Sequence, residues 1–556
     1  MPSLKWRFLV LSTLAAVPFI HFLLTHRYGF LYPEVLFALA LFLIPCALLA
    51  ALSKKEVAFH LVALILILLV STNAIHISLF PDLRLRYILS ALAALTAAGM
   101  YFMRDKFYYI VLVFAISVLG TDTAQAVVEW ASQQATSDSQ SNPSSRRHVV
   151  YLILDSQIGL AGFPRDIPES AEAEFALRSV LADNQFTIYP NAFSNYQFSK
   201  DSIPSILNRR LIPKTGYYFR DEPLKTVLLE NALFEQYATK GYAVNAYYSD
   251  YIGFPSTEFE VTSRTYYLNS LAVLHGLLES KLRWPSRLHQ LLTIYFQADA
   301  FLWEAYVRLA SERFRPKRLR LGPLAVAHVW PNQLLSDIRT AERDTLFFAH
   351  LLTPHDPYVY EATGQVRDPE EWTLEADMDS FERSRYVNLY RRYANQVIYL
   401  SRQLGAFLQE LRDIGVYDST TVVIHGDHGS RIRLLKEGER QEWEKLRVST
   451  PDCPYVSRYD YVSEPELRDL LDRFSTLFAV KHAQARESQI MEEKGSVSYF
   501  LQKEFDTSGQ NIDPNWNSVY LFNADGAPQE IPLLELWNEN NEVSIPNDDL
   551  QTFSNR

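Results

Sequence analysis

Cysteine is scarce in this sequence, which contains only Cys46 and Cys453 among its 556 residues. Cys46 lies in an apolar segment and Cys453 in the polar part of the chain, so we expect no disulfide framework. A zinc site built from several thiolates is excluded, because two cysteines cannot supply its ligands. The cysteine content therefore argues against both a disulfide-stapled fold and a thiolate metal site.

An excess of positive charge is also absent. The chain has 53 Lys and Arg against 64 Asp and Glu, and its formal net charge is -11. Proteins that bind nucleic acid need a basic surface that displaces counterions from phosphates, and no basic stripe is available here. We therefore expect no nucleic-acid partner.

Charged residues of either sign are rare in the first 128 residues, whereas the remainder carries nearly all of the charge. Four stretches contain no Asp, Glu, Lys or Arg and are long enough to cross a bilayer as helices. They are residues 8–24, 35–52, 57–80 and 87–103. A fifth stretch, 107–121, is shorter and would need tilt or an extended frame to span. Residues 1–128 thus predict an all-α transmembrane bundle of about five helices, with four as the alternative.

The orientation of this bundle follows from the basic residues that flank its spans. One side has Lys5, Arg7, Lys54, Lys55, Arg104 and Lys106, and the other has Arg27, Arg84 and Arg86. The side with more Lys and Arg is expected to face the cytoplasm. With five spans the rest of the chain lies outside the cytoplasm of a bacterial-type cell, as a multi-pass protein of the cytoplasmic membrane. With four spans the rest would be cytoplasmic.

Residues 129–147 are predicted to be a flexible linker, because they contain the polar run SQQATSDSQSNPSS. An α/β domain is expected over residues 148–480, with residues 481–556 as its C-terminal extension. Buried-type strand patterns occur at 148–154, 241–248, 345–351 and 421–424, and a helical pattern covers 386–414 before Gly415. This alternation predicts a mainly parallel central sheet covered by helices.

Polar residues follow three of these strands. Asp155, His355 and the pair Asp427 and His428 would meet at the carboxyl edge of a parallel sheet, where ligands collect in such folds. Carboxylates and imidazoles delivered together suit one divalent metal ion, zinc or manganese. The triplet Asp427-His428-Gly429 alone is a weak signal, because an Asp after a strand can equally cap a turn.

Four motifs together resemble the sulfatase and alkaline phosphatase superfamily. They are YLILD at 151–155, FSKDSIPSIL at 198–207, HLLTPHDPY at 350–358 and VVIHGDHG at 422–429. The membrane helices in front resemble the branch that contains lipoteichoic acid synthases, phosphoethanolamine transferases and phosphoglycerol transferases. The resemblance implies that Asp155, a hydroxyl nucleophile, Asp427 and His428 bind one metal ion. It also implies a lipid donor in the membrane and an envelope glycan or lipid acceptor.

The nucleophile has two candidates in the second motif. Matching either the Ser-Leu-Leu of sulfatases or the Ser-x-Pro of the transferases places it at Ser199, whereas the sulfatase Cys-x-Pro-Ser start would place it at Ser202. Ser199 is expected to be catalytic and to bind the metal. His355 is expected to contact a phosphate oxygen or to protonate the leaving alcohol, with a purely structural role as the alternative. We expect His350 to pack within its strand, and the role of His425 stays open.

Some family features are missing. Ser156 replaces the usual second Asp after Asp155, the Cys-x-Pro-x-Arg signature is absent, and residues 430–479 contain no histidine. The first two departures disfavour hydrolysis of sulfate esters, and the single cysteine of the soluble part favours the phosphoglycerol-type branch. The predicted function is transfer of a phosphate-containing head group through a serine intermediate. A sulfatase-like hydrolase or phosphodiesterase and a degenerate, non-catalytic scaffold in envelope polysaccharide assembly are the alternatives.

One further segment, residues 283–321, combines aromatic residues with many arginines. It could be an amphipathic region on the membrane surface, but a solvated helix pair packed on the soluble domain is the preferred interpretation.

Overall fold

The computed structural model describes residues 3–25, 28–52, 59–60, 63, 106, 146–214, 219–221, 226–249, 252–254, 260–266, 284–297, 322–368, 371–372, 379–380, 382–434, 467–505, 514–522 and 528–539. The chain divides into two compact units. One contains residues 1–140 and 269–319, and the other contains residues 141–268 and 320–556.

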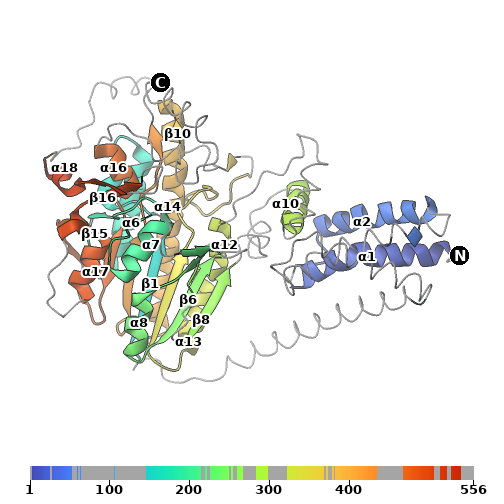
Figure 1. Cartoon of the computed structure of the whole chain (residues 1–556), viewed down its shortest axis with the longest axis horizontal. Coiled ribbons are helices and arrows are strands. Elements are labelled where there is room, and N and C mark those ends of the chain that lie inside the picture. The colour runs from blue at the N-terminus through green and yellow to red at the C-terminus, as the bar shows by residue number, and fades with distance from the viewer. Residues whose placement is uncertain are drawn as a thin grey trace. The chain divides into compact units, whose positions relative to one another are not determined.

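The first unit contains the two long apolar helices α1 (Leu4–Thr25) and α2 (Pro33–Leu52) (Figure 1). Both are long and apolar enough to cross a membrane. They correspond to the first two predicted spans. The other three, at 57–80, 87–103 and 107–121, lie almost wholly outside the described residues, so five spans and their orientation stay predictions.

A third helix of this unit, α10 (Trp284–Gln297), comes from much later in the chain. Its Trp284 ring stacks on Phe37 of α2, with 4.4 Å between centroids, and Arg287 Nε lies 3.1 Å from Glu34 Oε1. The prediction that this part of residues 283–321 packs on the soluble domain is therefore wrong. The aromatic and basic side chains of α10 contact the N-terminal helices instead.

The second unit is built on an eight-stranded sheet in the order β14-β2-β13-β11-β1-β9-β6-β8. The strands are β14 (Gln489–Ile490), β2 (Thr187–Ile188), β13 (Phe478–Lys481), β11 (Thr421–Gly426), β1 (His148–Leu154), β9 (Thr345–Leu351), β6 (Ala243–Ser249) and β8 (Val261–Tyr266). Only β13 runs antiparallel to its neighbours, β11 and β2. The predicted fold class, apolar N-terminal helices followed by an α/β domain with a mainly parallel sheet, is confirmed.

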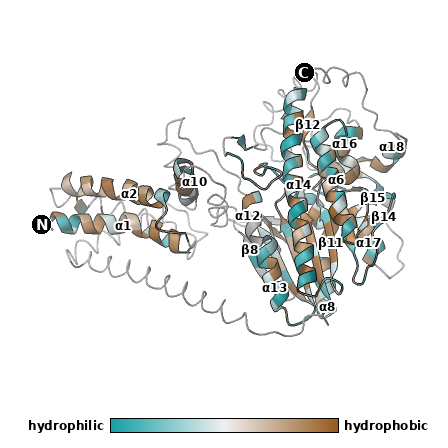
Figure 2. Ribbon diagram, turned by 180° about the vertical axis from the view of Figure 1, so that it is seen from behind, coloured by the Kyte–Doolittle hydropathy of each residue, from teal (hydrophilic) through white to brown (hydrophobic). Residues whose placement is uncertain are grey.

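Helices cover both faces of this sheet. Figures 1 and 2 show α7 (Ser199–Asn208), α8 (Ala232–Thr239) and α17 (Val497–Phe505) on one face, opposite α6 (Pro168–Asp183), α13 (Leu334–Thr340) and α14 (Arg383–Asp413). All seven residues of β1 are buried, as the uninterrupted apolar pattern predicts for a strand covered on both faces. The predicted helix at 386–414 is α14, which ends before Gly415 in the left-handed region, at φ 76°.

The remaining described elements are short and peripheral. The helices are η3 (Leu160–Gly162), α12 (Gly322–His328), η5 (Val329–Gln333), α16 (Leu467–Phe474), η8 (Pro514–Asn517) and α18 (Leu533–Glu539). The strands are β3 (Asn191–Phe193), β4 (Phe219–Asp221), β5 (Thr226–Leu228), β7 (Ile252–Gly253), β10 (Asp379–Ser380), β12 (Arg433–Leu434), β15 (Lys494–Ser496), β16 (Val519–Phe522) and β17 (Pro528–Ile531). Residues 481–505 thus extend the main sheet through β14 and cover it through α17.

Candidate metal centre

Three parallel strands end side by side at one edge of the sheet. In the register of β1, Leu154 pairs with Gly426 of β11 and with Leu351 of β9. The next residue, Asp155, donates its backbone N–H to the Leu351 carbonyl over 2.9 Å. The residues that follow β1, β9 and β11 therefore emerge together, as the sequence predicts.

Asp155, Asp427 and His428 form a compact group at this edge. Their ligand atoms all lie within 4.8 Å of one another, and the three side chains are buried. His428 Nδ1 lies 2.8 Å from the Gly429 carbonyl, to which its N–H donates, so the Nε2 lone pair faces the carboxylates. Nε2 is 3.6 Å from Asp155 Oδ1 and 3.5 Å from Asp427 Oδ2.

This group fits a divalent cation. Asp427 Oδ1 accepts from the backbone N–H groups of Ser156 and His428, over 2.9 and 3.0 Å, but Oδ2 has no hydrogen-bond partner in the described part of the chain. A buried carboxylate oxygen without a partner carries a large desolvation penalty, which a metal ion would remove. Two carboxylates and one imidazole suit zinc and manganese alike.

Ser199 begins α7 beside this group. Its Oγ lies 3.4 Å from His428 Nε2, and the residue is 8% exposed. The N-terminus of a helix also favours negative charge on a ligand at this position. Ser202, one turn further, donates its Oγ–H to the Asp427 carbonyl over 2.5 Å and lies 2.7 Å from Ser194 Oγ. Ser199 therefore lies beside the candidate ligands, whereas Ser202 hydrogen-bonds to the backbone of Asp427.

His355 lies at the rim of the centre, with 19% of its side chain exposed and Nε2 4.0 Å from Asp155 Oδ1. Its Nδ1–H donates to the Asp356 carbonyl over 2.7 Å, which turns Nε2 toward the site. Burial lowers the pKa of this imidazole, but the charges of Asp356 and Asp155 outweigh that effect and raise its pKa overall. A proton on Nε2 would lie close to the Asp155 carboxylate.

The surrounding charges also act on Asp155. Burial raises the pKa of this carboxyl, but the neighbouring histidines, His355 first and then His350 and His428, outweigh that effect and hold it well below its usual range. Burial is likewise the largest influence on His428 and lowers its pKa. The group therefore favours an ionised carboxylate and a neutral imidazole, the protonation states that metal ligands need.

His350 is a residue whose position sequence reasoning missed. It is buried in β9 as expected, but its Nε2 lies 3.4 Å from Asp155 Oδ2. The alternation of side chains along strands contains the signal: His350 pairs with Ile153, and Asp155 follows two residues later on the same face. His425 instead joins the core, where Nε2 lies 2.9 Å from Tyr151 OH and burial lowers its pKa to about 4.

Ser156 occupies the place of the usual second Asp. Ser156 has a left-handed backbone conformation, with φ 64°. Its N–H donates to Asp427 Oδ1, and its Oγ–H donates to Asp155 Oδ1 over 3.2 Å. The Tyr393 hydroxyl, from α14, donates to the Ser156 carbonyl over 2.9 Å. Ser156 thus orients both carboxylates, and neither it nor Tyr393 was identified as a site residue from the sequence.

Two glycines allow the close packing of the loop around Asp427. A Cβ at Gly426 would overlap Thr476 and the Gln157 carbonyl, and a Cβ at Gly429 would overlap the Asp472 carbonyl. The two glycines of the Gly-Asp-His-Gly pattern are therefore needed because neighbouring segments approach closely, whereas its Asp and His are the candidate ligands.

Comparison with known proteins agrees with this architecture. Residues 147–451 match the model of the sulfatase family. The chain belongs to the sulfatase family. No curated protein matches the chain.

Solved structures with a similar fold include the C-terminal periplasmic domain of EptC from Escherichia coli in complex with zinc, at 11% identity and a TM-score of 0.37. That match covers 69% of this sulfatase-family chain and 92% of the other. A phosphonate monoester hydrolase from Agrobacterium radiobacter is 11% identical, with coverages of 67% and 80% and a TM-score of 0.36. The hydrolase SpPMH from Silicibacter pomeroyi is 13% identical, with coverages of 67% and 75% and a TM-score of 0.38.

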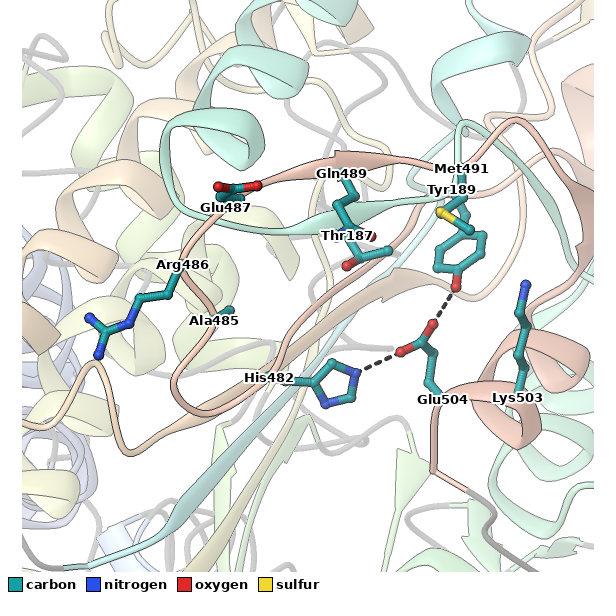
Figure 3. A pocket seen from close by; sticks show the side chains of 10 residues that line it. All are labelled: Thr187, Tyr189, His482, Ala485, Arg486, Glu487, Gln489, Met491, Lys503 and Glu504. Carbon is teal, nitrogen blue, oxygen red and sulfur yellow. Dashed lines mark hydrogen bonds and ion pairs between the residues drawn. The ribbon is translucent and has the colours of Figure 1, made fainter. Parts of the chain in front are cut away.

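A hollow of about 490 Å³ lies away from this centre, beside β2, β14 and α17 (Figure 3). Glu504 joins two of its lining side chains: it accepts from the Tyr189 hydroxyl, and its Oε2 lies 2.6 Å from His482 Nε2. His482 follows β13, which runs antiparallel to β11, so this pair lies toward the opposite end of the strands. None of the predicted site residues lines this hollow.

Proposed function

We propose that this protein is a membrane-anchored, metal-dependent transferase. It moves a phosphate-containing head group, of phosphoglycerol or phosphoethanolamine type, from a membrane lipid to an envelope glycan or lipid. The observation that carries the proposal is the position of Ser199, whose Oγ lies 3.4 Å from His428 Nε2 at the start of α7. A hydroxyl placed there, without the Cys-x-Pro-x-Arg signature, favours a phosphoryl-serine intermediate over sulfate-ester hydrolysis.

Asp155, Asp427 and His428 would hold the metal ion, together with Ser199. A bound divalent ion would lower the pKa of the serine hydroxyl and neutralise charge on phosphoryl oxygens. Ser199 would lose its proton to solvent, and its Oγ would form a bond to phosphorus as the bond from phosphorus to the lipid alcohol breaks. His355 Nε2 would protonate the departing alkoxide. The acceptor hydroxyl would then give its proton to His355, bond to phosphorus and release Ser199.

The proposed location is the outer side of a bacterial cytoplasmic membrane, with the protein anchored by several spans. The helices α1 and α2 support an anchor, and the basic residues near the spans support this orientation. The donor lipid would then share a bilayer with the enzyme.

The test uses the full-length protein in phospholipid vesicles that contain head-group-labelled phosphatidylglycerol or phosphatidylethanolamine. We expect label on Ser199 in mass spectra of rapidly quenched enzyme, and loss of turnover in Ser199→Ala. Ser401→Ala is the matched control, because that buried hydroxyl donates to the Val397 carbonyl of its own helix α14, over 2.8 Å, and has no other hydrogen bond among the described residues. Full turnover in Ser199→Ala together with inactive Asp427→Ala would rule out the covalent step.

A hydrolase is the second candidate, since the matching family is named for sulfatases and the same residues could use water as acceptor. Product analysis with and without a glycan acceptor separates the two, because only a transferase forms a labelled glycan. A protein that takes up no stoichiometric metal when zinc or manganese is supplied would instead be a non-catalytic scaffold.

A further inference from the structure

An arginine directly follows the Asp427-His428-Gly429 loop in an unusual backbone conformation. Arg431 lies in the left-handed region at φ 59°, although it is not a glycine. This conformation is unfavourable for a residue with a Cβ, so neighbouring contacts must impose it. Residues that keep such a conformation cluster at functional sites.

Those contacts come from the end of α16. The Asp472 carbonyl accepts from the Arg431 N–H over 3.2 Å, and the Arg473 carbonyl accepts from the Gly429 N–H over 2.8 Å. In addition, Ser430 donates its Oγ–H to Asp472 Oδ1 over 2.6 Å. The turn is therefore held at three consecutive positions, and it fixes the direction in which the Arg431 side chain leaves the backbone.

The guanidinium contacts the proposed acid and the residue that precedes the proposed nucleophile. Its Cζ is 5.3 Å from the ring centroid of Phe198, the residue that precedes Ser199, and its Nη2 is 3.4 Å from His355 Nε2. Arg431 is only 8% exposed, so its charge acts in a partly dehydrated environment. A cation held beside His355 raises the local positive potential and so favours an anionic ligand there.

We propose that Arg431 binds the anionic, non-bridging oxygens of the substrate's phosphoryl group and is therefore a substrate-binding residue of this centre. The planar guanidinium has two parallel N–H donors that match two oxygens of a phosphoryl group. On substrate binding its N–H donors would turn from His355 Nε2 to the phosphoryl oxygens, which would leave Nε2 to carry the proton for the leaving alcohol. This inference rests on the proposed function, because it takes Ser199 as the group that attacks phosphorus.

The test measures binding of inorganic phosphate to the full-length, metal-loaded protein by titration calorimetry, and so needs no turnover. We expect Arg431→Met to weaken phosphate binding by about 10- to 100-fold, and Arg431→Lys to recover part of the loss. In steady-state assays with a phosphodiester, Arg431→Met should raise KM more than it lowers kcat. Arg412→Met is the matched control, because Arg412 makes a cation–aromatic contact with Tyr417, at 4.0 Å, away from the centre.

A structural role for Arg431 makes different predictions. If the side chain only secures Phe198, Arg431→Met would lower the thermal midpoint and the metal content while phosphate affinity per loaded site stays unchanged. That outcome overturns the proposal, as does a parent protein that binds metal but no phosphate. Failure of the proposed function shows separately, as absence of label on Ser199 in a protein whose phosphate binding still depends on Arg431.

Discussion

Two histidine–carboxylate groups lie toward opposite ends of the same sheet, and they differ in how their charges are satisfied. His482 and Glu504 have 43% and 15% of their side chains exposed, and they bond to each other over 2.6 Å. Asp427 and His428 are fully buried, and Asp427 Oδ2 lacks a hydrogen-bond partner within the described ranges. The charges of His482 and Glu504 are satisfied by each other and by solvent. The buried Asp427 carboxylate carries a desolvation penalty, which a bound cation would remove. The exposed pair therefore shows no need for a ligand, although a hollow of about 490 Å³ adjoins it.

The largest effect should come from exchanging carboxylates in the two groups. Asp427→Asn should abolish metal binding and lower kcat/KM by more than about 1,000-fold, because it removes a charged ligand and the electrostatic stabilisation the metal supplies. Glu504→Gln is the matched change and should alter activity by less than about twofold. Metal analysis and kinetics of both variants check this. Equal losses of metal in the two variants would contradict the distinction between the groups.

A methyl group should test how tightly the buried loop is packed. Gly429→Ala places a Cβ against the Asp472 carbonyl, so we expect it to lower the free energy of unfolding by about 3 kcal/mol. Gly405→Ala is the matched control in α14, where the new Cβ would lie 3.7 Å from Val180 Cγ2, and it should stabilise by roughly 0.5 kcal/mol. Denaturant unfolding measures both. Similar stabilities for the two variants would show that the loop can relax.

A buried imidazole away from the centre should make stability depend on pH. His148 is 1% exposed and packs edge-to-face on Phe347, and burial lowers its pKa to about 4. As the pH falls, His148 becomes protonated near pH 6.5 in the unfolded chain but only near pH 4 in the folded protein. The contribution of the neutral imidazole to the free energy of unfolding is therefore fully present above pH 6.5. It decreases toward pH 4, by at most about 3 kcal/mol. His148→Phe should flatten this part of the curve. Parallel pH profiles for parent and variant would exclude the effect.

The smallest effect is expected at the exposed pair. His482→Ala should reduce stability by less than about 1 kcal/mol, because a solvated ion pair gains little over its hydrated partners. Thermal unfolding at low and high salt checks this, and salt should remove most of the difference. A loss of several kcal/mol would mean that the Tyr189, Glu504 and His482 contacts act as a buried network.

The sequence predicted the fold and placed the metal-ligand candidates at one sheet edge, because both features depend on local patterns. An uninterrupted apolar strand followed by Asp155, and another followed by Asp427 and His428, place these residues at one sheet edge for any parallel arrangement. The roles of His350, Ser156 and Arg431 were not predicted. They depend on strand register and on left-handed turns, which neither periodicity nor motif spacing reports.

The sequence by itself determined that the chain has an apolar N-terminal part, an α/β domain, and acidic and imidazole groups at the strand ends. Hydrophobic periodicity and burial of apolar surface are sufficient for these features. The tertiary structure decided that Ser199 rather than Ser202 faces His428, that α10 packs on α1 and α2, and that one histidine–carboxylate group is buried while the other is exposed. These outcomes depend on distances between segments far apart in the sequence, and packing alone sets those distances.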